Sequence, residues 1–84
     1  MKSFPEVFEL LMDAILEKES VEIEYQKSAY HNEEYSIRKI SPTRFVLVER
    51  RKSYFHRLCV EAHCHLRKDI RVFAVYRIKE LKKL

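Results

Sequence analysis

The sequence predicts an α+β domain in which an N-terminal amphipathic helix, at about residues 4–18, precedes a small five-stranded antiparallel sheet at about residues 21–78. Three observations carry this prediction. Apolar side chains recur with a period of about 3.6 as far as Leu16, and after Ser20 they alternate with polar ones. The third observation is a length of 84 residues without a linker-like segment, which is typical of a single domain over residues 1–84. Because so small a sheet must protect its edges, we expect it to be strongly bent or closed into a barrel.

The helix has a clear start signal and a wide apolar face. Ser3 and Glu6 have the spacing of a capping box, and Pro5 is compatible with the first turn. From Phe4 to Leu16 the apolar residues cover roughly 240° of the helical wheel. Contact with one small sheet needs less than this, so we expect the helix to pack on a second chain as well. The alternative is that its own domain covers it from both sides.

The strands follow from alternation and from the residues that interrupt it. Val21, Ile23 and Tyr25 alternate with polar residues and predict a half-buried strand over residues 21–26. The mostly polar residues 27–33 are predicted to form a hairpin loop. Further strands are predicted over residues 35–40, ended by Ser41 and Pro42, and over residues 44–49, 54–63 and 70–75.

Local composition refines this arrangement. Residues 45–48 are apolar on both faces, which places the strand over residues 44–49 in the centre of the sheet. The charged residues 50–53 are predicted to form a turn, and residues 77–81 a short helical turn or the end of a strand. Glycine is absent from the chain, so left-handed residues should be few.

The overall composition indicates a soluble protein. Hydrophobic residues at 46% and charged residues at 36% exclude disorder, and no apolar run approaches the length of a membrane span. The N-terminus lacks the pattern of a signal peptide. Cys59 and Cys64 point to opposite faces of the predicted strand, which excludes a disulfide between them. These features together predict a protein of the reducing cytoplasm.

Charge is distributed unevenly along the chain. Residues 1–34 hold 3 Lys/Arg and 9 Asp/Glu, a net charge of −6, whereas residues 35–84 hold 14 Lys/Arg and 4 Asp/Glu, a net charge of +10. A basic surface favours anionic partners such as nucleic acids or nucleotides. The alternative is that the two halves neutralise each other in the folded protein.

Residues typical of metal and catalytic sites are present, but their spacing is not. His56, Cys59, His63, Cys64 and His65 are of zinc-ligand types, yet the chain has no C-x-x-C pair and no two histidines four residues apart. On an extended strand only His63 and His65 lie close enough to chelate together. A phosphate-binding glycine loop cannot form without glycine. We therefore expect no metal, no other cofactor and no enzymatic activity.

The arginines are the more informative residues. Arg67, Arg71 and Arg77 lie in one segment together with aromatic residues, and Arg38 lies on a strand that can pair nearby. Guanidinium groups bind phosphate bidentately, and aromatic faces can stack on bases. The alternative is a solvated strand face in which Arg67 or Arg71 pairs with Asp69.

The order of residues in this segment resembles the WYL domain family. The most specific element is an alanine, a cysteine, an arginine, an acidic residue, an Arg-x-Phe group and a final Arg-Ile, here Ala62, Cys64, Arg67, Asp69, Arg71, Phe73, Arg77 and Ile78. Upstream, residues 21–25 and 38–42 are similar to the first strand of that family and to its Arg-x-hydrophobic-x-Pro element. The resemblance covers about residues 10–81. In the place of the family's Trp-Tyr-Leu tripeptide stand Leu58, Cys59 and Val60.

The resemblance implies an SH3-like or Sm-like barrel behind a helix, as in ligand-sensing domains of bacterial transcription regulators and phage-defence regulators. Such domains bind nucleic acids or nucleotides through a basic pocket. Most members also carry a helix-turn-helix, for which this chain has no room, so the resemblance implies a free-standing sensor, an accessory protein or an excised domain.

From both arguments we expect a non-catalytic regulatory module that binds an anionic ligand, such as single-stranded nucleic acid or a nucleotide. Phosphates would be held by Arg71 at the centre, Arg67 and Arg77 at the rim, and Arg38. Base contacts would come from Tyr25 and His63, with Phe73 equally suited to the core. The alternative function is a protein–protein adaptor or dimer that uses the broad apolar face of the N-terminal helix.

Overall fold

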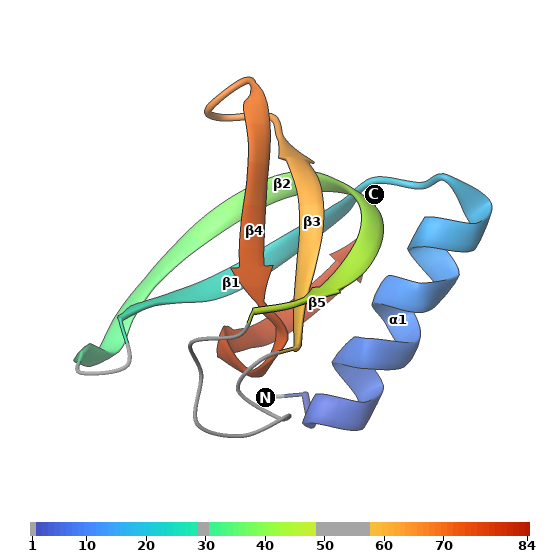
Figure 1. The fold of residues 1–84 in the computed structure, drawn as a ribbon. Helices are drawn as coiled ribbons and strands as arrows, with labels where there is room; N and C mark the ends of the chain where they lie inside the picture. The colour runs from blue at the N-terminus through green and yellow to red at the C-terminus, as the bar shows by residue number, and fades with distance from the viewer. Residues whose placement is uncertain (1, 29–30, 49–57) are drawn as a thin grey trace.

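The computed structural model describes residues 2–28, 31–48 and 58–84 and confirms an α+β fold with one helix before a five-stranded antiparallel sheet (Figure 1). In chain order the elements are α1 (Phe4–Glu17), β1 (Val21–Ser28), β2 (His31–Leu47), β3 (Leu58–Cys64), β4 (Asp69–Ala74), the 3₁₀ helix η1 (Val75–Arg77) and β5 (Ile78–Lys83). Across the sheet the strand order is β4-β3-β2-β1-β5. Within these described ranges, no helix combines the length and the apolar character that crossing a membrane requires.

Helix α1 begins at the predicted capping box. Ser3 Oγ accepts a hydrogen bond from the Glu6 backbone N–H at 3.4 Å, and Glu6 Oε1 accepts one from the Ser3 backbone N–H at 3.2 Å. Hydrogen bonds from the Ser3 side chain and backbone hold the pKa of the Glu6 carboxyl below its ordinary value. The helix ends at Lys18, whose φ of 55° is left-handed. Lys18 and Lys68 are the left-handed residues among those described, as the absence of glycine predicts.

Strand β2 is one long element, so the prediction that Ser41 and Pro42 end a strand is wrong. Its first part pairs with β1 and its second part with β3, and Ile40 lies opposite residues of both neighbours. A register shift follows between Pro42 and Arg44. Proline is tolerated there because the pairing with β1 stops at Ile40, so that β2 has a neighbour on one side only. The apolar residues 45–47 do belong to the central strand of the sheet, which ends at Leu47.

The fifth strand comes from the end of the chain. Residues 78–83 form β5, which pairs with β1, and the short helical turn lies just before it at residues 75–77. Residues 77–81 were predicted to form a helical turn or the end of a strand. In the structure most of them belong to a complete strand. The hairpin loop is shorter than predicted, since β1 extends to Ser28 and β2 begins at His31. The predicted turn over residues 50–53 and the start of the strand predicted from residue 54 lie outside the described residues.

The core lies between α1 and one face of the bent sheet, called here the inner face. Helix α1 contributes Val7, Leu11 and Ala14 and packs against β2, β5 and η1. The inner face and the chain around η1 contribute the remaining buried residues, which are Val21, Ile23, Ile40, Val60, Ala62, Cys64, Phe73, Val75, Ile78 and Leu81. Both cysteines are buried free thiols.

The domain's own sheet covers most of the apolar arc of α1. The Phe8 ring stacks on Phe45 with 4.7 Å between the ring centroids. Of the apolar residues on the helix, Met12 and Leu16 remain exposed, with 38% and 71% of their surface accessible. Helix contact with a second chain stays a prediction that concerns these two side chains.

We expect Leu11→Ala to lower the free energy of unfolding by about 2–5 kcal/mol, because Leu11 is fully buried and its truncation leaves a cavity. Leu16→Ala is the matched control on the same helix and should change it by less than about 0.5 kcal/mol. Urea unfolding followed by circular dichroism measures both values. Equal losses in the two variants would contradict this packing of α1.

Candidate anion-binding site

The antiparallel register brings polar residues onto the inner face beyond the edge of the core. Residues opposite each other on paired strands point to the same face of a sheet. Arg38 lies opposite the core residue Ile23, and Ser36 lies opposite Tyr25. On the other side of the sheet, Arg71 of β4 lies opposite the buried Ala62 of β3. The inner face is therefore apolar at one end and basic at the other.

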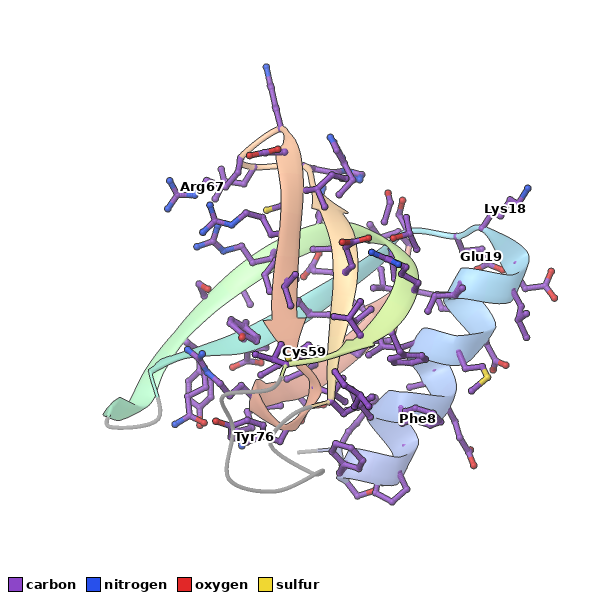
Figure 2. All side chains as sticks on the ribbon, viewed as in Figure 1. Phe8, Lys18, Glu19, Cys59, Arg67 and Tyr76 are labelled. Carbon is purple, nitrogen blue, oxygen red and sulfur yellow. The ribbon has the colours of Figure 1, made fainter. Side chains whose placement is uncertain are left out.

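These residues surround an open depression of about 470 Å³, which we call the arginine depression. Its lining residues are Tyr25, Ser36, Arg38, Arg67, Arg71, Val72, Phe73 and Arg77. Four of these eight side chains are arginines and none is a carboxylate. Arg67 lies at the turn between β3 and β4, at the end of this hairpin that is distant from α1 (Figure 2). The volume falls within the range typical of small-molecule sites.

Arg38 and Arg77 are half-buried and held by neighbouring groups. Arg38 Nε donates a hydrogen bond to Ser36 Oγ at 3.3 Å. Arg77 Nε donates to the Gln26 carbonyl oxygen at 3.0 Å, and the central carbon of its guanidinium lies 4.7 Å from the centroid of the Tyr25 ring. These contacts fix both cations before any ligand arrives.

Arg67 and Arg71 are exposed, and their guanidinium groups have no hydrogen bond or ion pair with the described residues. Asp69 lies between them in the sequence, but its Oδ1 accepts the backbone N–H of Ile70 at 2.7 Å. The alternative in which Asp69 neutralises these arginines is therefore not what the structure shows. Arg71 was expected to be the most central of the four arginines, yet Arg38 and Arg77 are the less exposed ones.

Tyr25 lines the depression and also holds neighbouring residues in place. Its hydroxyl accepts the backbone N–H of Ala74 at 2.9 Å, at the junction of β4 and η1. Its ring meets that of Phe73 edge-on, with 5.1 Å between the centroids and an interplanar angle of 89°. Burial raises the pKa of the Tyr25 hydroxyl, although the Ala74 hydrogen bond and the Arg77 charge oppose it. Tyr25 thus connects β1 to β4 and orients Arg77.

Cys64 lies beneath the depression and was predicted only as a core residue. Burial raises the pKa of its thiol, but hydrogen bonds from the backbone N–H groups of Arg67 and Leu66 and from the Arg38 side chain outweigh burial and lower it. The sequence analysis did not predict that Cys64, Ser36 and the Gln26 carbonyl accept hydrogen bonds from arginine side chains of the depression. Only the two-residue spacing of Ser36 and Arg38, which puts both on one face of a strand, could have indicated one of them.

The structure does not bring His63 to the arginine depression. Strand β3 turns Ala62 and Cys64 inward, so His63 points to the outer face. There its ring lies 5.5 Å from that of His65, whose Nε2 is hydrogen-bonded to Ser41 Oγ at 2.8 Å. Among the described residues, no three His, Cys, Asp or Glu side chains are grouped so that they could hold a metal ion. His56 lies outside those residues.

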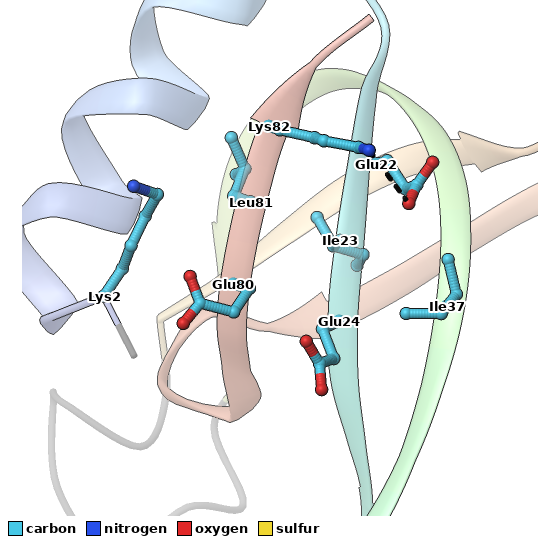
Figure 3. A pocket seen from close by; sticks show the side chains of 8 residues that line it. All are labelled: Lys2, Glu22, Ile23, Glu24, Ile37, Glu80, Leu81 and Lys82. Carbon is cyan, nitrogen blue, oxygen red and sulfur yellow. Dashed lines mark ion pairs between the residues drawn. The ribbon is translucent and has the colours of Figure 1, made fainter.

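The acidic side chains of β1 lie elsewhere. A second depression, of about 310 Å³, lies beside β1 and β5. It is lined by Lys2, Glu22, Ile23, Glu24, Ile37, Glu80, Leu81 and Lys82, which Figure 3 labels. Here Lys82 Nζ pairs with Glu22 Oε1 at 3.9 Å. Glu22 of the acidic half thus pairs with a nearby lysine and does not line the arginine depression.

The fold and the site define a small α+β domain with an arginine-lined depression. Residues 6–83 match the WYL domain, and the chain belongs to this family. Its fold is similar to that of proteasome accessory factor B/C (PafBC) of Arthrobacter aurescens, with a TM-score of 0.78 and 21% sequence identity. The match covers 95% of this chain and 11% of that one, so the chain corresponds to a small part of the larger protein. No curated protein gives a significant sequence match.

We expect Tyr25→Phe to cost about 1–2 kcal/mol of stability, because the Ala74 N–H loses its acceptor in a partly buried position. Since the pKa of Tyr25 is raised on folding, its contribution is complete below about pH 10 and is lost as the pH rises through the folded pKa. Urea unfolding at pH 8 and at pH 11 measures both effects. If the free energy of unfolding falls with pH equally in the wild type and in Tyr25→Phe, the loss of stability does not come from ionisation of Tyr25.

Proposed function

We propose that this WYL domain is a non-catalytic sensing module that binds an anionic ligand, such as single-stranded nucleic acid or a nucleotide, in the arginine depression. One observation carries the proposal. Four arginines line the same depression, and none of the described residues that line it is a carboxylate. Like charges held together repel one another, and a polyanion relieves this repulsion while accepting the hydrogen bonds of the guanidinium groups.

The geometry of the four arginines favours binding over simple solvation. Arg38 and Arg77 are already oriented by Ser36, Gln26 and Tyr25, so less conformational entropy is lost when a ligand binds them. Arg67 and Arg71 are exposed and supply guanidinium groups that no described residue engages. Two oriented and two adaptable cations suit a ligand with several anionic oxygens.

A regulatory role is supported by family membership and not by the site alone. The chain is a WYL domain, and its match to PafBC spans 11% of that protein. A domain of this size that captures an anion would act by reporting it to a partner chain or to a further domain. We propose control of transcription, including phage-defence regulation, as the setting in which this signal is used.

Arg71→Ala should weaken binding of a 5′-phosphorylated single-stranded oligonucleotide by about 2 kcal/mol, or roughly 30-fold. Arg71→Lys should recover part of this loss, because it keeps the charge but not the two-pronged hydrogen bonding. Fluorescence anisotropy at low salt measures the affinities. For the wild type, log affinity should fall with log salt by about 0.7 for each phosphate that is neutralised.

The matched control is Arg44→Ala. Arg44 is also an exposed strand arginine, but it forms an ion pair with Glu61 at 2.8 Å and does not line the depression. Its loss should leave affinity within about threefold of the wild type, since exposed pairs of this kind contribute little. Equal losses for Arg44→Ala and Arg71→Ala would indicate diffuse electrostatic attraction, and the binding site proposed here would then be wrong.

A second candidate function is protein–protein contact through α1, favoured by the exposure of Met12 and Leu16 one helical turn apart. If the domain pairs with itself through this face, Leu16→Asp should convert dimers to monomers while the fold is retained. Sedimentation equilibrium over a wide concentration range measures the mass, with Lys83→Asp, at an exposed position of β5, as a surface control. A wild type that is monomeric throughout would exclude self-association through α1.

A further inference from the structure

The arginine depression contains cationic donors but few groups that could recognise a nucleobase. Base edges are read mainly by Asn, Gln, Asp, Glu and Arg side chains. The described residues that line the depression include none of the first four. Ser36 is the one hydroxyl besides that of Tyr25, and it already accepts a hydrogen bond from Arg38. The described lining therefore offers guanidinium groups and little else to a polar ligand.

The aromatic faces are also occupied. One face of the Tyr25 ring lies against the guanidinium of Arg77, at 4.7 Å, and Phe73 meets this ring at 89°. Phe73 itself is only 6% exposed. The remaining support for a base would be the plane of a guanidinium group, which stacks on every base in a similar way. A guanidinium group that holds a phosphate is not available to a guanine edge, so neither stacking nor base-edge hydrogen bonding would then discriminate between bases.

Resting on the proposed function, we infer that the depression recognises a chain of linked phosphates without reading a base. The ligand class is a compact oligophosphate, either inorganic or as the triphosphate of a nucleotide. Its closely spaced charges match arginines that are gathered in one depression of about 470 Å³. In an oligonucleotide the phosphates are separated by sugars and spread beyond the four arginines, where salt screens them.

The test compares four ligands with the full chain by isothermal titration calorimetry at 0.15 M salt. The probes are inorganic tripolyphosphate, ATP, GTP and a six-nucleotide oligothymidylate with a 5′-hydroxyl. Tripolyphosphate, ATP and GTP should agree within about threefold, and the oligonucleotide should bind at least about tenfold more weakly. Equal affinities for tripolyphosphate and ATP assign recognition to the phosphates, whereas a preference above about tenfold for one nucleotide, or for ATP over tripolyphosphate, overturns the inference.

Variants locate the binding. Arg71→Ala should weaken tripolyphosphate binding by at least about tenfold, and Arg44→Ala should leave it within about threefold. If Arg71→Ala weakens the oligonucleotide but tripolyphosphate does not bind, the inference falls and the anion-binding function stands. If neither probe binds even at low salt, both fall. Oligonucleotide binding as tight as that of tripolyphosphate would also overturn the inference.

Discussion

Much of this structure depends on one constraint, the pairing of β1 with β2 that places Ile23 opposite Arg38 and Tyr25 opposite Ser36. Side chains opposite each other share a face, so a strand that contributes to the core at one end contributes to the arginine depression at the other. A shift of one residue in this register would turn Arg38 outward and bring Ile37 or Lys39 to the inner face in its place. The hydrophobic core and the arginine depression therefore both depend on this one register.

The core has to offset an electrostatic cost at the site. Four arginines line one depression, and Coulomb repulsion between them disfavours the folded state without an anion. Opposing this are the fully buried side chains of α1 and the sheet, such as Leu11, Ile23 and Ile40. The core faces α1, whereas the arginines line a depression that is open to solvent. Solvent can therefore still screen the repulsion between the arginines.

Tyr25 links these two regions. Its ring contacts the buried Phe73 on one side and the Arg77 guanidinium on another, and its hydroxyl holds the start of η1 through Ala74. Strand β5 follows η1 directly and packs against α1. A ligand that displaced Arg77 would act on a residue between the site and β5, which contacts α1. This is a physical route from the arginine depression to the helix.

The sequence by itself determined the capped helix and the α+β class, and it singled out the arginines that line the depression. Capping and hydrophobic periodicity are local properties, and the family pattern of residues 62–78 is read in sequence order. The tertiary structure alone decided that Ser41 and Pro42 lie within β2, since the loss of one neighbouring strand at Ile40 is what makes a proline acceptable there. It also decided that residues 78–83 form β5, because that strand exists through its pairing with β1, far away in the sequence. At the site, alternation along β3 turned His63 outward, and Tyr25 became a support for Arg77 because the two residues, although distant in sequence, meet across the sheet.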